Sequence, residues 1–334
     1  MGHRMEDVAH RANVSVATVS HVVNKTRYVA PGTRDRVLKA IQDLNYHRDA
    51  HARRLAIGQS DFFGLIVSDI VNPFFPELIK SFETAALDRG FDLMLSNTNY
   101  DPRRTQQAVR KMIENKVRGV AVMTSEFSVA LTVELTANRV AVVFLDEGTV
   151  QPYTSCIRVN YSEGIYEAIH HLVELGHREI AFIAGPQSLR SAVTRRKAAA
   201  DALRKHGVES AQTIEANHRA EGGISAVETL LKSSRFPTAV LCSNDLMAIG
   251  AMSAIQEAGL RVPEDVSVVG FDDIYFARIT RPPLTTVNLP RDRVGSLALK
   301  ALQRIIRSKN GTGAEYIVDT HLVIRKSTGP AAVR

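Results

Sequence analysis

The stretch of sequence that decides the fold of the N-terminal region is Asp7–Asn24, which reads DVAHRANVSVATVSHVVN. Apolar residues recur in it at helical spacing, with Val8 and Ala12 on one stripe. Asn13 suits the left-handed residue that ends a helix, and Ser15 suits the N-cap of the next helix. The pattern predicts two short helices joined by a tight turn.

The second predicted helix has two unlike sides. Its valines form the side that faces a core, while Ala17, His21 and Asn24 project from the opposite side. That outer side carries no Glu or Asp, so it can approach a polyanion, as the recognition helix of a helix-turn-helix does. Helical periodicity alone would equally fit a small helical hairpin of unrelated purpose.

The individual residues distinguish these two interpretations, because many positions match one known pattern without a gap. The matching residues are DVA at 7–9, Ala12, VS at 14–15, TVS at 18–20 and VVN at 22–24. They resemble the headpiece of the lactose-repressor/galactose-repressor family of bacterial transcription regulators. The continuation, SHVVNKTR at 20–27, is most similar to the purine- and ribose-repressor branch.

The resemblance implies a sequence-specific, homodimeric DNA-binding repressor that a small molecule controls. Two-fold symmetry would pair two recognition helices with a pseudo-palindromic operator in double-stranded DNA. Reading of base edges would fall to His21, with Val16 and Ala17 making apolar contacts. The residues expected to position the DNA backbone are Thr18, Ser20, Asn24, Lys25 and Arg27.

Length and composition limit the class of protein. The chain has 334 residues, which fits two or three domains, and 45% hydrophobic residues are enough for sizeable cores. No run is apolar for the length of a membrane span, and the N-terminus lacks the apolar core of a signal peptide, so we expect a cytoplasmic protein without a membrane partner. Cys156 and Cys242 lack paired metal-ligand spacing and are expected to be buried, in a reducing compartment.

Positive charge is concentrated near the N-terminus. Residues 1–60 contain 10 Lys/Arg and 5 Asp/Glu, a net charge of +5 out of the chain's +7. The remaining residues carry 32 basic against 30 acidic side chains, which is nearly neutral. A basic module on a neutral body indicates that the module binds a polyanion, although charge alone would also fit an ordinary solvated surface.

A third helix is expected after this pair, from Pro31, which suits a first helical turn, to Asn45, which would end it. Three helices packed on a few valines and leucines make a small domain, which we place at residues 1–48. The residues expected on the buried stripe of the third helix are Val37, Leu38, Ile41 and Leu44.

Residues 49–60 separate this domain from the rest of the chain. The alanine-rich part at 49–57 is too short to be a stable helix alone in water, and by itself it would be an ordinary linker. The resemblance implies instead a hinge helix that folds on operator DNA. Leu55 would then wedge into the central base step of the minor groove, while Arg53 and Arg54 would meet phosphates.

From Phe62 onward the sequence alternates apolar strand-like runs with helix-like stretches, which is typical of a mostly parallel α/β fold. The pattern repeats before and after about residue 160, so each half resembles a doubly wound unit. A cleft between two lobes is then the natural ligand site. The strand-like runs are Phe63–Val67, Phe91–Leu95, Gly119–Met123, Val140–Phe144, Ile180–Ile183, Ala239–Leu241 and Val266–Val269.

The fold class we expect is therefore an all-α helix-turn-helix headpiece plus an α/β two-lobed core with two doubly wound parallel sheets. NPFF at 72–75, GHR at 176–178, NDLMAIG at 244–250 and VGFDD at 269–273 resemble the family's effector core, itself akin to periplasmic sugar-binding proteins. The implied ligand-binding and dimerisation core is 61–334, with an N-subdomain at about 61–159 plus 290–318 and a C-subdomain at about 160–287 plus 319–334.

A sugar-like ligand needs aromatic faces for its apolar sides and fixed polar groups for its hydroxyls. The C-terminal ends of parallel strands should supply the polar groups. By resemblance, the positions that match effector contacts are Asn72, Phe74, Phe75, Asp146, Ser191, Arg195, His218, Asn244 and Asp272, with Asn288 in the crossover segment.

Several of these residues have another interpretation. Asn72 could simply end a strand and cap a helix, and at least one of Phe74 and Phe75 should belong to a core. Asp272 could be one of two carboxylates that shape a turn. The neighbouring Asp245 is expected to be an N-cap.

Four positions depart from the known branches of the family. Leu189 and Ser191 stand where a purine-binding relative would have Arg and Thr, which argues against a purine. Glu147 stands where a ribose-binding relative would have Arg, and His218 stands where an aromatic ring is expected. We predict a polar sugar or sugar-like effector, with Glu147 either favouring an amino group or pairing with a cleft arginine.

Two other function classes fit less well. A transport-type sugar-binding protein would have an export signal and no basic helical headpiece. An enzyme would need a base, a nucleophile or a phosphate loop, and neither G-x-G-x-x-G after a strand nor G-x-x-x-x-G-K-[ST] is present. His170 and His171 are neighbours on a helix and point in different directions, which does not suit a metal pair. We predict no catalytic residue, metal or cofactor.

Overall fold

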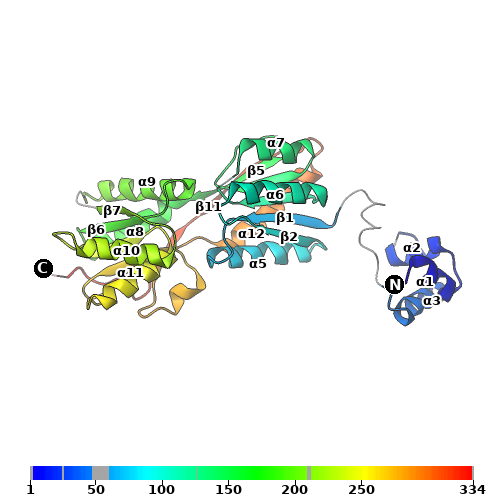
Figure 1. Ribbon diagram of the computed structural model, residues 1–334, viewed down its shortest axis with the longest axis horizontal. Helices are drawn as coiled ribbons and strands as arrows, with labels where there is room; N and C mark the ends of the chain where they lie inside the picture. The colour runs from blue at the N-terminus through cyan, green and yellow to red at the C-terminus, as the bar shows by residue number, and fades with distance from the viewer. Residues whose placement is uncertain (1–2, 25, 47–59, 126, 209–211, 333–334) are drawn as a thin grey trace. The chain divides into compact units, whose positions relative to one another are not determined.

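A computed structural model describes residues 3–24, 26–46, 60–125, 127–208 and 212–332 (Figure 1). The chain forms two compact units, Met1–Ser60 and Asp61–Arg334. Each unit has apolar clusters of its own.

The described part of the first unit folds into helices around a small core. The core contains one fully buried valine from each helix, Val8, Val19 and Val37. Pro31 stands at the first turn of the third helix, as predicted. The helices are α1 (Met5–Ala12), α2 (Val16–Asn24) and α3 (Pro31–Asp43).

The turn between α1 and α2 has the predicted chemistry. Asn13 has a φ of 52°, and its N–H bonds to the carbonyls of Ala9 and His10. The Oγ of Ser15 accepts a hydrogen bond from the Thr18 N–H at 3.2 Å, which caps α2. The predicted helix pair is therefore confirmed.

The buried stripe of α3 differs from the prediction at one position. Val37 and Ala40 are buried, and Ile41 and Leu44 pack against the same cluster. Leu38, however, is 46% exposed. Because one residue along a helix is a rotation of about 100°, Leu38 lies off the stripe that begins at Val37, and the prediction for it was wrong.

The first lobe of the second unit is a six-stranded sheet in the order β11-β5-β4-β3-β1-β2, with neighbouring strands parallel. Its strands are β1 (Phe62–Val67), β2 (Asp92–Asn97), β3 (Gly119–Met123), β4 (Ala141–Leu145), β5 (Thr154–Asn160) and β11 (Glu315–Asp319). Its helices are α5 (Phe74–Leu87), α6 (Pro102–Glu114), α7 (Val129–Ala137) and α12 (Arg291–Arg307).

The second lobe is also a six-stranded sheet, in the order β12-β10-β9-β8-β6-β7, with only β12 antiparallel to its neighbour. Its strands are β6 (Ile180–Ala184), β7 (Gln212–Glu215), β8 (Ala239–Cys242), β9 (Ser267–Asp272), β10 (Thr285–Asn288) and β12 (His321–Val323). Its helices are α8 (Tyr161–Glu174), α9 (Arg190–Lys205), α10 (Ala220–Leu231), α11 (Asp245–Glu257) and the 3₁₀ turn η1 (Tyr275–Arg278).

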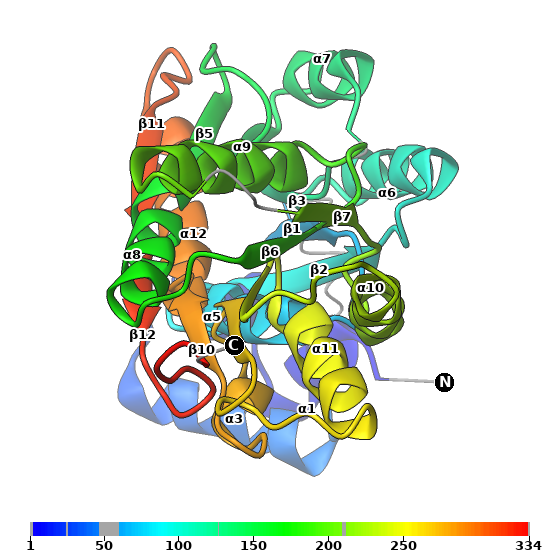
Figure 2. The ribbon, with the colours of Figure 1, turned by 90° about the vertical axis from the view of Figure 1, so that its left-hand side faces the viewer.

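Helices cover both faces of each sheet because successive residues of a strand point to opposite faces. In β1, Leu65 packs with α5 and α12, whereas Ile66 packs with α6 and α7. In β6, Phe182 packs with α8 and α9, whereas Ile183 packs with α10 and α11. Figure 2 views this second lobe end-on, with the two helix pairs on either side of its sheet.

The chain passes between the lobes after β5, after β10 and after β11. The last crossing is short, since β11 ends at Asp319 in the first lobe and β12 begins at His321 in the second. Several separate segments of the chain therefore connect the two lobes. This arrangement favours a hinge motion over a flexible linkage.

The structure confirms the predicted fold class. Each predicted strand-like run overlaps a strand, but β5, β7, β10, β11 and β12 were not anticipated. The edge strand β7 is mostly exposed and reads QTIE, so it lacks the apolar run on which the prediction depended. Cys156 and Cys242 are buried free thiols, as expected.

Two features are absent from the described residues. No helix there is long and apolar enough to cross a membrane. In the same part of the chain, no group of three or more His, Cys, Asp or Glu side chains could hold a metal ion.

Candidate functional site

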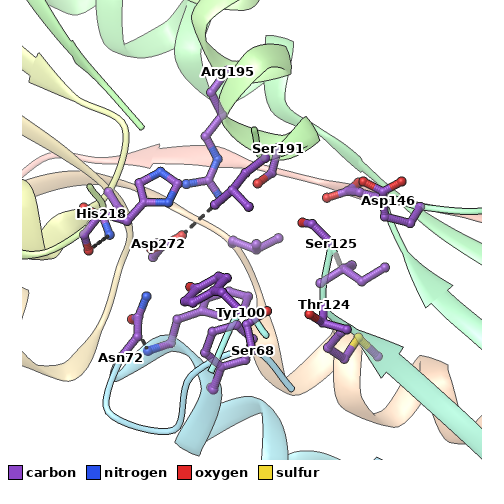
Figure 3. A pocket seen from close by; sticks show the side chains of 18 of the residues that line it. Ser68, Asn72, Tyr100, Thr124, Ser125, Asp146, Ser191, Arg195, His218 and Asp272 are labelled. Carbon is purple, nitrogen blue, oxygen red and sulfur yellow. Dashed lines mark hydrogen bonds and ion pairs between the residues drawn. The ribbon is translucent and has the colours of Figure 1, made fainter. Parts of the chain in front are cut away.

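A pocket lies between the two lobes, where strands of both sheets end. Segments after β1, β2, β3 and β4 form its first-lobe side, and segments after β6, β7, β8 and β9 form its second-lobe side. Figure 3 shows Arg195, His218 and Asp272 on one side and Asp146 with Ser125 on the other. The lining residues are Ser68, Asn72, Phe74, Phe75, Tyr100, Met123, Thr124, Ser125, Leu145, Asp146, Glu147, Tyr161, Leu189, Ser191, Arg195, His218, Asn244, Asp272 and Leu289.

All but one of the predicted effector residues line this pocket. They are Asn72, Phe74, Phe75, Asp146, Ser191, Arg195, His218, Asn244 and Asp272. Asn288 does not line it. Its Nδ2 donates to the Asp273 carboxylate at 3.0 Å, and it faces a second groove together with Glu77 and Arg291. The contact with Asp273 therefore holds Asn288 away from the pocket.

Arg195 and Asp272 form a buried ion pair. Arg195 Nη2 lies 3.4 Å from Asp272 Oδ1, and the two side chains are 8% and 6% exposed. Arg195 Nη1 donates to the Ser243 carbonyl at 2.5 Å. The guanidinium carbon lies 4.8 Å from the ring centroid of Tyr161 and 4.0 Å from that of Phe271. Burial raises the pKa of Asp272 to about 6, and the neighbouring guanidinium groups limit that rise.

Asp146 is held from two directions. The Tyr161 hydroxyl donates to one carboxylate oxygen, and the Val159 N–H donates to the other at 2.8 Å. Burial raises the pKa of Asp146, while these two hydrogen bonds act in the opposite direction. Since each carboxylate oxygen has a second lone pair, Asp146 can still accept a hydrogen bond from a ligand hydroxyl.

His218 is a neutral imidazole at the second-lobe wall. Burial, followed by the positive charge of Arg195, lowers the pKa of His218 to about 3. Its Nε2 lies 3.4 Å from Ser243 Oγ. Gly185 makes room for the ring, because a Cβ added there would lie 1.9 Å from His218 Nε2.

We expect Gly185→Ala to destabilise the protein by about 1–3 kcal/mol through overpacking against this ring. The loss should disappear in a His218→Ala background, because the clashing ring is then absent. Urea unfolding of the four proteins of this cycle measures the effect. Gly32→Ala is the matched control, since nothing lies within 4 Å of a Cβ added at Gly32. An equal loss in both backgrounds would contradict the assignment.

The two asparagines that line the pocket also accept hydrogen bonds from the first turns of helices. Asn72 neither ends β1 nor is the N-cap of α5, which is Pro73, but its Oδ1 accepts from the N–H of Phe74, the first residue of α5, at 3.0 Å. Asn244 Oδ1 accepts from the Met247 N–H at 3.0 Å. The Asn244 Nδ2 donates to the His218 carbonyl at 2.8 Å, which fixes the loop that carries the imidazole.

Asp245 does not cap α11, so that prediction was wrong. Asn244 is the N-cap, and Asp245 is the first helical residue. The Asp245 carboxylate instead accepts from the Ile274 N–H at 2.8 Å and from the Thr286 hydroxyl at 2.5 Å. Burial, followed by the nearby negative charge of Asp272, raises its pKa well above the usual value. Asp245 therefore ties β10 to the loop after β9.

Uncommon backbone conformations gather at the pocket. Asp146, His218 and Asp272 have φ values of 61°, 62° and 111°. Non-glycine residues rarely adopt positive φ, and those that do often lie at functional sites, where the surrounding structure holds them. This observation supports a ligand site independently of the side-chain chemistry.

Several polar lining residues were missed from the sequence, namely Ser68, Tyr100, Thr124, Ser125 and Tyr161. Ser68, Thr124 and Tyr161 come directly after β1, β3 and β5. The rule that strand ends supply polar groups would have found them if β5 had been recognised and every strand end examined. Tyr100 lies beyond β2 at a φ of 58°, and no short pattern points to it.

In the first unit, the predicted base-contacting residues lie on the outer side of α2. Val16 is 40% exposed, Ala17 is exposed, and His21 is half-buried. His21 Nδ1 lies 2.9 Å from Thr26 Oγ1, so one ring nitrogen is oriented by the chain. The helix carries no acidic residue in its first turn.

The predicted backbone-contacting residues differ in how they are held. Arg27 is exposed, while Thr18, Ser20 and Asn24 are half-buried. Asn24 Nδ2 donates to Ser20 Oγ at 2.9 Å, and Thr18 Oγ1 lies 2.9 Å from Ser15 Oγ. The predicted contacts Lys25, Arg53, Arg54 and Leu55, and the predicted hinge helix at 49–57, lie outside the described residues.

Two family models match the chain. Residues 4–49 match the model described as bacterial regulatory proteins, lacI family. Residues 169–328 match the model described as periplasmic binding protein-like domain. The first match falls on the α1–α3 unit, and the second covers most of the second lobe together with α12 and β11 of the first lobe.

Curated relatives cover nearly the whole chain. The chain is 37% identical over 327 residues to the HTH-type transcriptional repressor PurR of Pasteurella multocida, covering 97% of this chain and 98% of that one. It is 38% identical over 326 residues to PurR of Mannheimia succiniciproducens, with the same coverage.

A solved structure matches over the same extent. The lac repressor dimer bound to operator and the anti-inducer ONPF is 30% identical, covers 98% of this chain and 100% of that one, and gives a TM-score of 0.88. Full-length identity and full-length structural likeness agree with both family models. The chain belongs to the lacI family of bacterial regulatory proteins and is a transcriptional regulator.

Proposed function

We propose that this chain is a cytoplasmic repressor that holds a pseudo-palindromic operator as a homodimer and responds to a sugar-like effector in the pocket between its lobes. The DNA-binding part of this proposal rests on one observation. The outer side of α2 has no acidic residue, and α2 belongs to a first unit that is basic. The lac repressor structure, a dimer bound to operator, supports the same assembly.

We assign base reading to His21, with Val16 and Ala17 making apolar contacts, and backbone contacts to Thr18, Ser20, Asn24, Lys25 and Arg27. The contact of His21 with Thr26 supports this role, because an oriented ring can present its other nitrogen in a defined direction. Family resemblance supports phosphate contacts by Arg53 and Arg54 and a minor-groove wedge by Leu55 in a hinge segment at 49–60.

His21→Ala should weaken binding to the specific operator by about 1–3 kcal/mol more than binding to random duplex DNA. The reason is that a base contact contributes only where the correct base is present. Fluorescence anisotropy with a labelled operator and a scrambled duplex measures both affinities. His3→Ala is the control, since His3 is an exposed histidine that precedes α1. Equal losses on both duplexes would move His21 to the backbone-contacting group.

We propose that the pocket residues Asn72, Phe74, Phe75, Asp146, Ser191, Arg195, His218, Asn244 and Asp272 contact the effector. The mixture of carboxylates, amides and hydroxyls beside the phenylalanine pair suits a ring with several hydroxyls. Leu189, an apolar residue of the wall, supports a sugar-like ligand over a purine, because a purine-binding relative would have Arg there.

A buried arginine connects this pocket to the crossing between the lobes. Arg291 Nε and Nη2 lie 3.0 and 2.8 Å from a carboxylate oxygen of Glu77 on α5. The same guanidinium donates to the carbonyls of Asp272 and Asp273, at the end of β9. Since Asp272 also holds Arg195, a ligand that shifts this pair can bias how the lobes are held. It does so only if it binds one arrangement better than the other.

A transport-type sugar-binding protein is the alternative for the core alone. Operator binding separates the two functions, because a transport protein has no use for duplex DNA. Purified full-length protein that showed no preference for any duplex from its own genome, with and without candidate sugars, would contradict the repressor function.

A further inference from the structure

We propose that the pocket takes an uncharged ligand with several hydroxyl groups and excludes the phosphorylated or carboxylated form of the same molecule. This inference rests on the proposed function only in treating that ligand as the effector. Proteins commonly hold anions with arginines and helix N-termini. In this pocket, the chain itself already contacts or opposes most of these groups.

Arg195 is the only arginine or lysine among the residues that line the pocket, within the described part of the chain. A phosphate usually receives two parallel N–H bonds from one arginine. Here Nη1 donates to the Ser243 carbonyl and Nη2 faces the Asp272 carboxylate. The rings of Tyr161 and Phe271 lie against the guanidinium.

The guanidinium of Arg195 has one further nitrogen. Its Nε is buried and has no hydrogen-bond partner within the described residues. A buried donor without a partner is costly, so a ligand acceptor at this position would be favourable. Nε carries one N–H, which suits one hydroxyl oxygen, and the two Nη groups that could extend it into a fork already contact Ser243 and Asp272.

The helix N-termini beside the pocket are also occupied. Asn72 Oδ1 takes an N–H of the first turn of α5, and Asn244 Oδ1 takes one of the first turn of α11. The first turn of α9 has no side-chain cap, but Glu147 lies across the cleft from it. Glu147 Oε2 is 3.9 Å from Nη1 of Arg190, the first residue of that helix. An anion at this helix start would therefore meet a carboxylate that is already paired with the arginine of the first turn.

The charge of the lining residues opposes anions as well. They include three acids, Asp146, Glu147 and Asp272, against the single base Arg195. His218 adds no positive charge, because burial lowers its pKa to about 3. Carboxylates in a confined site repel a phosphate strongly but accept hydrogen bonds from hydroxyls. The same groups therefore favour the free sugar and disfavour its phosphate ester.

Inorganic phosphate is the first probe, titrated by calorimetry into the full-length protein without DNA. We expect no saturable binding by the wild type. Two substitutions should each confer phosphate binding. Asp272→Asn frees Arg195, and Glu147→Gln removes the carboxylate that faces α9. Glu147 is the more exposed of the two acids, so its variant tests the inference even if Asp272→Asn unfolds. Asp201→Asn is the control, because it removes an exposed acid from the outer side of α9.

Matched pairs of sugars are the second probe, with D-ribose against D-ribose 5-phosphate and D-glucose against D-glucose 6-phosphate. Whenever one sugar of a pair binds, the uncharged sugar should bind at least about 100-fold more tightly than its phosphate ester. The inference would be overturned if the wild type bound phosphate saturably and Arg195→Ala abolished that binding. A tighter-binding phosphate ester would also overturn it, as would a failure of both folded acid variants to gain phosphate binding. Because no DNA is present, these results are independent of operator binding.

Discussion

Operator affinity should fall steeply with salt, by about 10³- to 10⁵-fold between 50 and 200 mM if the dimer neutralises about six to ten phosphates. The physical reason is the release of counterions from the duplex as basic side chains replace them. Residues 1–60 carry a net charge of +5, whereas the rest of the chain carries +2, so the effect should come from the first unit. Anisotropy titrations of a labelled operator at several salt concentrations measure how the logarithm of the association constant depends on the logarithm of the salt concentration. The slope of that plot should be about −0.9 per phosphate neutralised.

The same experiment tests single residues. Arg27→Gln removes an exposed charge that follows α2. The magnitude of the salt slope should fall by about one for each phosphate contact that a protomer loses. Arg110→Gln removes the same charge from an exposed position on α6 in the second unit, and it should leave the slope unchanged. A slope near zero in the wild type would contradict DNA binding through phosphates.

Arg195→Ala should remove the effector response and destabilise the protein by about 3–5 kcal/mol. Asp272 would remain buried without its main partner, and a buried charge that loses its partner is strongly unfavourable. The unfolded carboxyl has its ordinary pKa of 3.8, while burial raises the folded pKa of Asp272 to about 6. Without Arg195 the folded pKa rises further, so the folded state binds the proton more readily than the unfolded state. The loss of stability should therefore be greater at pH 8 than at pH 5.

Urea unfolding at both pH values measures this loss. The double variant Arg195→Ala/Asp272→Asn should recover much of the stability, because it leaves no unpaired charge, but it should not recover the effector response. Operator affinity without effector should change little in either variant, since the α1–α3 unit is untouched. A single variant as stable as the wild type at pH 8 would show that the ion pair contributes nothing.

The local patterns of the sequence determined much of the fold. The spacing of Val8, Ala12 and Val19, with Asn13 and Ser15 at the turn, was sufficient to predict α1 and α2 because helix ends depend on neighbouring residues. Apolar runs predicted the central strands of both sheets because these strands are buried on both faces. Edge strands such as β7, which reads QTIE, carry little of that signal.

Residues at strand ends were partly predictable as well. Asp146 and Asp272 follow or end strands, and parallel strands bring their C-terminal ends to one edge of a sheet. This rule, with the family resemblance, was enough to propose most of the residues that the structure brings together. It did not separate the side chains that face the pocket from those that turn away.

That separation was decided by tertiary structure. Asn288 turns to the Asp273 carboxylate, and Asp245 accepts hydrogen bonds from the loop after β9 and from β10. The placement of Arg195, which leaves its Nε without a partner, likewise depends on contacts with Ser243 and Asp272, which lie far away in the sequence. Periodicity and caps are set by residues a few positions apart, so the sequence alone determined them. The direction of a buried polar side chain is set by whichever distant partner satisfies its hydrogen bonds, and only the folded chain supplies that partner.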